Sequence, residues 1–287
     1  MITGAYGYIG SRIRARLDQT GWDTTALSRN PRQGDRAQQW SLGEELGQSA
    51  AEGADVLVHC AYDLTLRQVT DIWRVNVEGS ARLLTSAANA GVPRLMLISS
   101  MSAYEGTGQL YGRAKLAIEK ETLALGGIAV RPGLVYGPQP GGMAGTLLRL
   151  TRLPITPVLT GAAKQYTVHE DDLAAVIVQV LGADTWTSEV FGVAQPTAVA
   201  FRQLLQGLAS REDRICRMVP VPWRAAYFAV RMAEVMRLPI GLRSDSFAGL
   251  IRPAPMVPIS GAFPRIQDSL IPFNEYVERI SLRADPS

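Results

Sequence analysis

The chain has 287 residues, of which 47% are hydrophobic and 19% are charged. This composition excludes a disordered or fibrous chain, and the length fits one large domain or two closely packed ones. The formal net charge is +3, from 29 basic and 26 acidic residues, which is too small a surplus to indicate a nucleic-acid surface. No apolar run reaches the roughly 18 residues that predict a membrane span, and residues 1–4 do not begin a signal peptide.

Cysteine and histidine are scarce. Cys60 and Cys216 lie far apart, so the sequence predicts no disulfide framework and favours a reducing compartment; we expect a cytoplasmic protein. His59 and His169 lack neighbours at metal-ligand spacing, so no metal site is predicted. His59 lies in an apolar run typical of a buried position, whereas His169 precedes three acidic residues that are typical of a helix N-terminus.

Short apolar runs alternate with helix-length amphipathic segments along most of the chain. The predicted strands are residues 23–28, 54–60, 94–99, 127–131 and 189–192. The predicted helices between them are residues 9–20, 75–90 and 111–125. Strands and helices that alternate at these lengths form right-handed crossovers. The sequence therefore predicts a doubly wound (Rossmann) α/β fold, with a parallel sheet covered by helices on both faces.

A glycine-rich loop opens the first predicted helix, with glycines at three-residue intervals. Such glycines permit a tight turn, a close backbone approach to a pyrophosphate and close packing of helix on sheet, and the helix N-terminus attracts the anion. The predicted cofactor contacts in this loop are Gly4, Tyr6, Gly7, Tyr8, Ile9 and Gly10. Only two residues precede the threonine of the loop, so either the first strand is unusually short or the chain begins upstream of this numbering.

The end of the strand at residues 23–28 bears on the choice of cofactor. An acidic residue there would bind the ribose 2′-hydroxyl of NAD, whereas an arginine accommodates the 2′-phosphate of NADP. The strand ends in Ser28 and Arg29, without an acid. Arg29 therefore favours NADP; NAD remains the alternative, since a loop arginine is often only solvated.

Tyr111 and Lys115 are four residues apart, on one face of a predicted helix. A tyrosine with a pKa of about 10 exchanges protons poorly at neutral pH, but a nearby lysine cation favours the phenolate. Upstream, the strand at residues 94–99 leads into the hydroxyl residues Ser99, Ser100 and Ser102. They would lie at the edge of the sheet where open α/β folds bind substrates.

Together these motifs resemble the short-chain dehydrogenase/reductase family. The TGxxGxxG spacing is similar to its extended branch, the nucleotide-sugar epimerases, dehydratases and reductases. Asn76 within residues 74–79, residues 131–138 and residues 168–174 also resemble segments of that branch in order. The resemblance covers about residues 1–210.

The resemblance implies roles for individual residues. Tyr111 would move the substrate proton, Ser100 would hydrogen-bond the reacting oxygen, and Lys115 would hold the nicotinamide ribose and assist Tyr111. Because Glu105 interrupts the usual Tyr-Gly pair, registers through Ser99 or Ser102 stay open. The further cofactor contacts expected are Ser28, Arg29, Cys60, Ala61, Tyr62, Asn76, Ser99, Pro132 and Leu134, together with Tyr111 and Lys115. The expected substrate contacts are Tyr62, Ser102, Tyr104, Arg149 and Lys164, of which the last two would bind a diphosphate.

The resemblance also implies an activity, hydride exchange between a nicotinamide and a carbinol or ketone carbon. Met101 and Ser102 stand where the dehydratases of the branch carry an Asp-Glu pair, so dehydration is disfavoured. The expected substrate is a nucleotide-linked sugar, in a 4-epimerase or 4-ketoreductase reaction. The alternatives are an NADPH-dependent reductase of a small non-sugar ketone or aldehyde, like the dihydroflavonol-reductase-like or hydroxysteroid-type relatives, and a catalytically silent NAD(P)-sensing protein. A homodimer is expected, because helices equivalent to residues 75–90 and 111–125 often pair in the family.

The last third of the chain is rich in proline and has fewer strand signals. We expect a dinucleotide-binding domain over residues 1–180 and a smaller substrate-binding lobe over residues 181–287, which residues 132–165 also supply. Residues 223–238 combine aromatic residues and methionine with arginine. This pattern favours a helix that packs on the main lobe or shapes the substrate pocket, over a helix that lies on a membrane surface.

Overall fold

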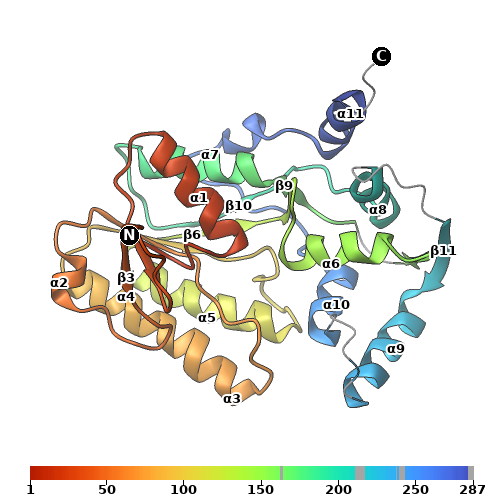
Figure 1. The fold of residues 1–287 in the computed structure, drawn as a ribbon, viewed down its shortest axis with the longest axis horizontal. Helices are drawn as coiled ribbons and strands as arrows, with labels where there is room; N and C mark the ends of the chain where they lie inside the picture. Colours follow the sequence, from red (N-terminus) through yellow and green to blue (C-terminus); the bar gives the residue numbers. More distant parts are fainter. Residues whose placement is uncertain (162–163, 211–216, 237, 239–242, 284–287) are drawn as a thin grey trace.

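The computed structural model describes residues 1–161, 164–210, 217–236, 238 and 243–283, with side chains up to residue 278. Its centre is a seven-stranded sheet in the order β10-β6-β5-β4-β1-β2-β3 (Figure 1), in which every pair is parallel. The strands are β1 (Ile2–Thr3), β2 (Ala26–Ser28), β3 (Ala37–Gln39), β4 (Val56–His59), β5 (Arg94–Ile98), β6 (Ile128–Pro132) and β10 (Val190–Val193). The predicted doubly wound α/β fold is confirmed. Within this sheet, β3 is the strand that the sequence pattern did not indicate, because its Ala-Gln-Gln segment is short, mostly polar and not β-branched.

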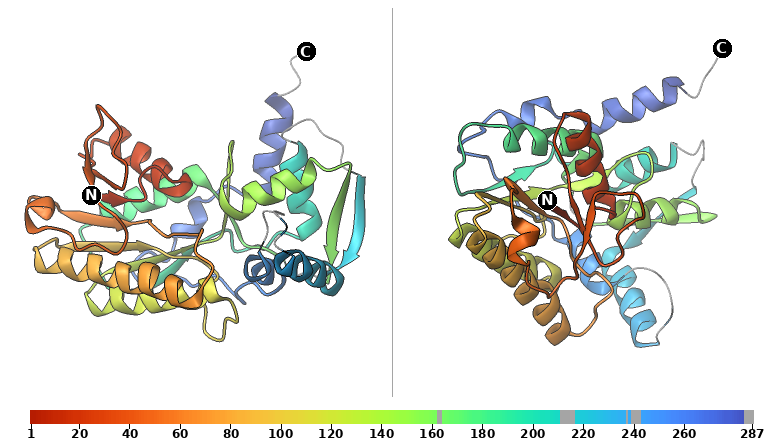
Figure 2. Two further views of the ribbon diagram at one scale, coloured as in Figure 1. Left: turned by 60° about the horizontal axis from the view of Figure 1, so that its bottom comes forward. Right: turned by 60° about the vertical axis from the view of Figure 1, so that its left-hand side comes forward.

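Helices cover both faces of this sheet, as Figure 2 shows. On one side lie α1 (Tyr8–Gln19) and α7 (Glu170–Leu181), and on the other lie α4 (Gly79–Asn89) and α5 (Leu110–Ala124). Successive strand residues point to opposite faces, so Val56 and Val58 join the core under α1 and α7, whereas Leu57 joins the core under α4 and α5. A strand that is buried on both faces must be apolar at every position, which is why β4 reads as a continuous run.

The helix predicted at residues 75–90 begins earlier than expected. A short turn, α3 (Val69–Asp71), leads into a π-helical segment, η1 (Ile72–Glu78), and then into α4. Such π-helical turns are rare and recur at functional sites. Asn76 lies inside this segment and is fully buried.

A smaller lobe packs against the carboxyl edge of the sheet, on the right of Figure 1. Its elements are β7 (Leu134–Tyr136), α6 (Gly142–Thr151), β8 (Ile155–Thr160), β9 (Thr167–His169), α8 (Phe201–Ser210), β11 (Arg217–Pro222), α9 (Trp223–Val235), α10 (Ser244–Ile251) and α11 (Phe273–Arg283). Two further short helices, α2 (Gln48–Ala51) and η2 (Ile266–Ser269), pack on the two faces of the main sheet. Two short parallel pairs, β7 with β9 and β8 with β11, hold it together. The chain crosses between the two parts repeatedly, since α6 and β8 precede α7 and β10.

Membrane-spanning elements and metal clusters are not found within the part of the chain that the structure describes. No helix there is both long and apolar enough to cross a bilayer. No group of three or more histidine, cysteine or carboxylate side chains there could hold a metal ion. Cys216 lies outside the described residues.

Candidate active site

The glycine loop joins β1 to α1 at the carboxyl edge of the sheet. Gly4 has a φ of +62°, a conformation that favours glycine, and the Gly7 N–H donates to its carbonyl at 2.8 Å. A Cβ on Gly10 would lie 2.2 Å from the Gly4 carbonyl oxygen, so only glycine lets the helix start this close to the loop. The first turn of α1 contains no acidic residue. The loop therefore offers backbone N–H groups and a positive helix end to a pyrophosphate, as predicted for a dinucleotide.

A buried hydrogen-bond chain fixes the backbone beside this loop. The Thr3 hydroxyl accepts the N–H groups of Cys60 and Ala61, each at 3.1 Å. With both lone pairs used, its proton goes to His59 Nδ1 at 2.7 Å, and His59 Nε2 then donates to Ser80 Oγ at 2.8 Å. Burial lowers the pKa of His59 to about 3, so the ring is neutral and this tautomer is the one that fits. The predicted burial of His59 is confirmed.

Asn76 holds the loop that follows β4. Its Oδ1 accepts the Asp63 N–H at 2.7 Å, and its Nδ2 donates to the Asp63 carbonyl at 3.2 Å. The Ser80 hydroxyl donates to the Asn76 carbonyl, which joins this clamp to the chain through His59. Asn76 is fully buried, so its side chain positions the loop that carries Tyr62 and does not reach the cavity described below.

The helix α5 brings Tyr111 and Lys115 together with Tyr62. The Tyr62 and Tyr111 rings meet edge to face, with their centroids 5.0 Å apart. Lys115 Nζ lies 5.1 Å from the centroid of the Tyr62 ring and donates to the Ile98 carbonyl at 2.9 Å. Lys115 is 2% exposed, so its ammonium group lies against the Tyr62 ring and away from bulk water.

Burial sets the acidity of this pair. It raises the pKa of Tyr111 to about 12, and a hydrogen bond with Ser100 opposes that rise. It lowers the pKa of Lys115 to about 8, while Cys60 and Glu119 oppose that fall. From the spacing of Tyr111 and Lys115, the sequence predicted a lowered pKa for Tyr111. This prediction was wrong, because burial of the phenol raises its pKa by more than the neighbouring groups lower it. At neutral pH Tyr111 therefore carries its proton and can donate it.

A cavity of about 480 Å³ opens in front of Tyr111, between the sheet edge and the smaller lobe. The predicted site residues that line it are Tyr8, Ile9, Tyr62, Ser100, Ser102, Tyr111, Pro132 and Leu134. Ser99 is not among them, because its hydroxyl donates to Glu119, which also binds Arg131 in the core. Of the serine registers left open by the sequence, Ser100 and Ser102 reach the cavity.

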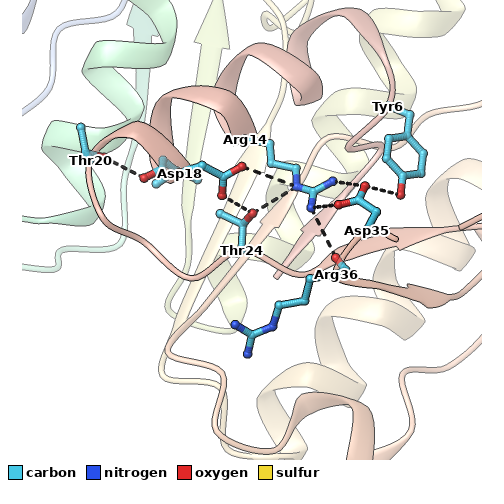
Figure 3. A network of polar contacts seen from close by, with 8 residues as sticks. Tyr6, Arg14, Asp18, Thr20, Thr24, Asp35 and Arg36 are labelled. Atoms are coloured by element: carbon cyan, nitrogen blue, oxygen red, sulfur yellow. Dashed lines mark hydrogen bonds and ion pairs between the residues drawn. The ribbon is translucent and has the colours of Figure 1, made fainter. Parts of the chain in front are cut away.

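The loop that joins β2 to β3 takes part in a polar network, drawn in Figure 3. Asp35 accepts both terminal nitrogens of Arg14 and the Tyr6 hydroxyl, at 2.8 Å from the last of these. These partners hold the pKa of Asp35 well below its usual range. Arg32 stacks over the Tyr6 ring, with its guanidinium carbon 4.3 Å from the centroid. Tyr6 thus braces the loop after β2, at whose start Ser28 is half-buried and Arg29 is exposed.

Three predicted substrate contacts lie outside the cavity wall. Arg149 is exposed on α6 and donates to Thr146 at 2.9 Å, and Lys164 is exposed ahead of β9. The Tyr104 hydroxyl donates to the Arg252 carbonyl at 3.0 Å, so this side chain holds the segment after α10.

The sequence reasoning missed the part of the wall that α10 and its flanks supply. Arg243, Asp245, Gly249 and Leu250 line the cavity as well. A Cβ on Gly249 would lie 2.3 Å from the Gln109 amide, so α10 approaches the start of α5 very closely. No motif marks these residues, because their role follows from where the smaller lobe packs.

The residues of this site lie within the part of the chain that matches a known protein family. The profile of the NAD dependent epimerase/dehydratase family matches residues 1–194, which contain the glycine loop, Ser100, Tyr111 and Lys115. The chain belongs to this family. The recognised resemblance to the extended short-chain dehydrogenases/reductases is thereby confirmed.

Curated proteins that resemble the chain carry the names of different enzyme activities. A ceramide reductase from Caulobacter vibrioides is 32% identical over 188 residues, which are 62% of this chain and 59% of that protein. A UDP-glucose 4-epimerase from Vibrio cholerae is 25% identical over 258 residues, 77% of this chain and 78% of that protein. The chain thus spans about three fifths of the ceramide reductase, and about a quarter (23%) of three mycobacterial relatives that are uncharacterised.

Solved structures that resemble the chain share its fold. MoeE5 in complex with UDP-glucuronic acid and NAD superposes with a TM-score of 0.66 at 24% identity, over 77% of this chain and 84% of that one. The UDP-glucose 4-epimerase of Thermus thermophilus in complex with NAD gives a TM-score of 0.63 at 20% identity, over 86% of this chain and 98% of that one. At these identities the likeness shows the fold alone.

Proposed function

We propose that this family member is an NAD(P)-dependent oxidoreductase that acts at a ketone or carbinol carbon, with Tyr111 as the group that moves the proton. The observation that carries the proposal is the Tyr111 phenol in the cavity wall, hydrogen-bonded to Ser100 and one helical turn from the buried Lys115. Its proton stays on the oxygen at neutral pH and is available to a carbonyl oxygen.

The chain's own residues divide the remaining work. Ser100 hydrogen-bonds the carbonyl oxygen and so favours the charge that develops on it. Lys115 would stabilise the phenolate left after proton donation, since its ammonium lies against the Tyr62 ring, which packs edge to face on Tyr111. The glycine loop, the backbone of Cys60 and Ala61, and the segment with Pro132 and Leu134 would hold the dinucleotide, whose nicotinamide supplies or accepts the hydride when bound.

Replacement of Tyr111 tests this function. Tyr111→Phe keeps the ring contact with Tyr62 and removes only the hydroxyl, so kcat for NAD(P)H oxidation should fall about 10²- to 10⁴-fold. The Kd for NADPH, measured by fluorescence titration, should stay within about twofold of that of the parent chain. Retained turnover would refute the assigned role. A chain that binds the dinucleotide but turns over no ketone, alcohol or sugar substrate would instead be the NAD(P)-sensing protein.

For the cofactor, we propose NADP over NAD. Arg29 follows Ser28 at the end of β2, where an acidic residue would bind the 2′-hydroxyl of NAD, and its exposed side chain is available to a 2′-phosphate. NAD remains the alternative, because the solved complexes of MoeE5 and the Thermus epimerase contain NAD.

For the reaction, we propose net reduction of a non-sugar ketone. Both basic residues expected to bind a diphosphate, Arg149 and Lys164, are exposed outside the wall. The ceramide reductase relative is named for a lipid substrate, which supports the same reading. A nucleotide-linked sugar is the second candidate, favoured by the likeness to UDP-glucose 4-epimerase. Incubation with UDP-glucose and NAD, followed by chromatography for a 4-epimer, separates the two.

We also propose a cytoplasmic homodimer in which α4 and α5 pair across the interface. The exposed positions of these helices, such as Arg82, Arg113 and Lys120, are mostly polar, so the interface would be held by ion pairs around a small apolar centre. Sedimentation at two ionic strengths tests this, since screening weakens surface ion pairs.

A further inference from the structure

The described wall of the cavity carries charged groups, but each is engaged by the protein. The charged lining residues are Asp63, Arg243 and Asp245. The Asp63 carboxylate accepts the Thr65 N–H at 2.8 Å, and Arg243 Nη1 donates to the Leu66 carbonyl at 2.9 Å. The Asp245 carboxylate accepts two N–H groups at the start of α5. One arginine and two carboxylates give the described wall no surplus of positive charge that would attract a diphosphate.

The uncharged part of the same wall combines hydroxyl and amide groups with a larger apolar surface. It includes Leu64, Leu66 and Ile72 from the segment after β4, Met143 from α6, and Leu250 from α10. Leu64 lines the cavity and is also 62% exposed, so it lies at the mouth. An apolar group at the mouth as well as inside is typical of a site whose ligand is apolar along its length.

Polar contacts link the mouth of the cavity to the end of α9. Arg243 contacts the Leu64 carbonyl at 3.4 Å, and the next residue, Ser244, donates its N–H to Glu234 at 2.9 Å. Glu234 is in the last turn of α9, which packs beside α10 (Figure 1). The two residues that follow it, Val235 and Met236, are 72% and 64% exposed.

We infer that the substrate is an uncharged ketone or secondary alcohol that carries an extended apolar chain. The inference rests on the proposed function. The reacting carbon lies beside Tyr111, and the chain follows Leu66 to Leu64 at the mouth, where it leaves the enclosed part of the cavity. In reduction, the carbonyl carbon accepts the hydride of NAD(P)H and its oxygen takes the Tyr111 proton, which yields a secondary alcohol and the oxidised cofactor.

A binding series tests this without depending on turnover. The probes are 2-butanone, 2-hexanone, 2-octanone and 2-decanone, titrated calorimetrically into the NADPH complex of the Tyr111→Phe variant. Each methylene buried against the wall should lower Kd about fourfold, until the chain leaves the enclosed part of the cavity. A Kd independent of chain length, or UDP-glucose binding more tightly than 2-decanone, would overturn the inference.

A variant at the mouth sharpens the test. Leu64 is largely exposed, so Leu64→Asp should leave the fold intact while placing a charge on the path of the chain. The preference for 2-decanone over 2-butanone should fall at least tenfold. Ile259→Asp is the matched control, because Ile259 is 65% exposed and lies outside the cavity wall. Equal preferences in the parent chain and Leu64→Asp would contradict the proposed path.

Turnover by the parent chain separates the inference from the proposed function. Chain-length-dependent binding without oxidation of NADPH would leave the apolar site standing and refute the chemistry at Tyr111. Turnover of 2-butanone with no gain for longer ketones would leave the chemistry standing and refute the apolar site.

Discussion

Asp245 caps the helix that carries Tyr111. Its Oδ1 accepts the Leu110 N–H at 2.7 Å and its Oδ2 accepts the Tyr111 N–H at 3.2 Å. The residue that precedes α5, Gln109, provides no side-chain cap, and the first turn of α5 contains no acid. The carboxylate therefore satisfies two open N–H groups and the positive end of the helix, across the boundary between the two parts of the molecule. In this way the smaller lobe holds Tyr111 in place.

Loss of this cap should affect both stability and catalysis. Asp245→Ala should lower the free energy of unfolding by about 1 to 2 kcal/mol, measured in urea, because a capping side chain is lost. The value of kcat should fall while the Kd for NADPH is retained, since α5 loses its fixed start. Asp245→Asn keeps an acceptor oxygen and should recover part of both. Asp184→Asn, at an exposed site after α7, is the control for the charge change. Wild-type kcat in Asp245→Ala would contradict a positioning role.

The buried Lys115 should make stability depend on pH above neutrality. Its pKa is lowered from 10.5 to about 8, so between these values the unfolded chain binds more protons than the folded one. Stability from this group is therefore lowest below about pH 8 and rises as pH increases towards about 10. Lys115→Met removes the titration, so the gain in parent stability from pH 7.5 to 9.5, relative to this variant, should be roughly 2 kcal/mol. Urea titrations of both chains across that range measure it. Parallel curves would show that Lys115 keeps an ordinary pKa.

Arg29 should discriminate between the two dinucleotides. Arg29→Ala should raise the Kd for NADPH about 10- to 100-fold, because a charge-assisted contact with the 2′-phosphate is lost. The Kd for NADH should change less than twofold. Arg36→Ala removes the same charge from an exposed arginine that pairs with Asp23 at 2.9 Å, and should leave both constants unchanged. Equal losses for NADPH and NADH in Arg29→Ala would refute a 2′-phosphate contact.

The Thr3 hydroxyl should contribute strongly to the free energy of unfolding. Thr3→Val keeps the shape but leaves the N–H groups of Cys60 and Ala61 and the Nδ1 of His59 without their partner. Unsatisfied buried groups of this kind should cost about 2 to 4 kcal/mol of unfolding free energy. Thr3→Ser keeps the hydroxyl and should lose only about 1 kcal/mol, for the missing methyl group. Similar losses in both variants would show that packing of the methyl group matters and the hydrogen bonds do not.

The sequence by itself determined the fold class, the glycine loop and the Tyr111–Lys115 pair. Each of these depends on fixed spacing within one strand, loop or helix, so local geometry alone brings the residues together. It also placed Ser100 and Ser102 at the end of β5. It could not exclude Ser99, because only the packed core shows that this hydroxyl binds Glu119.

Only the tertiary structure decided which residues of the smaller lobe contact α5 and the segment after β4. Asp245 is 134 residues from Tyr111, and Arg243 is 177 from Leu66, in a lobe that has no repeated spacing to read. Contacts over such separations depend on how two independently patterned surfaces pack, and many residue types could have filled the same place. The pKa of Tyr111 also depends on the tertiary structure. The spacing of Lys115 predicted a lower pKa, whereas burial of the phenol in the assembled site raises it.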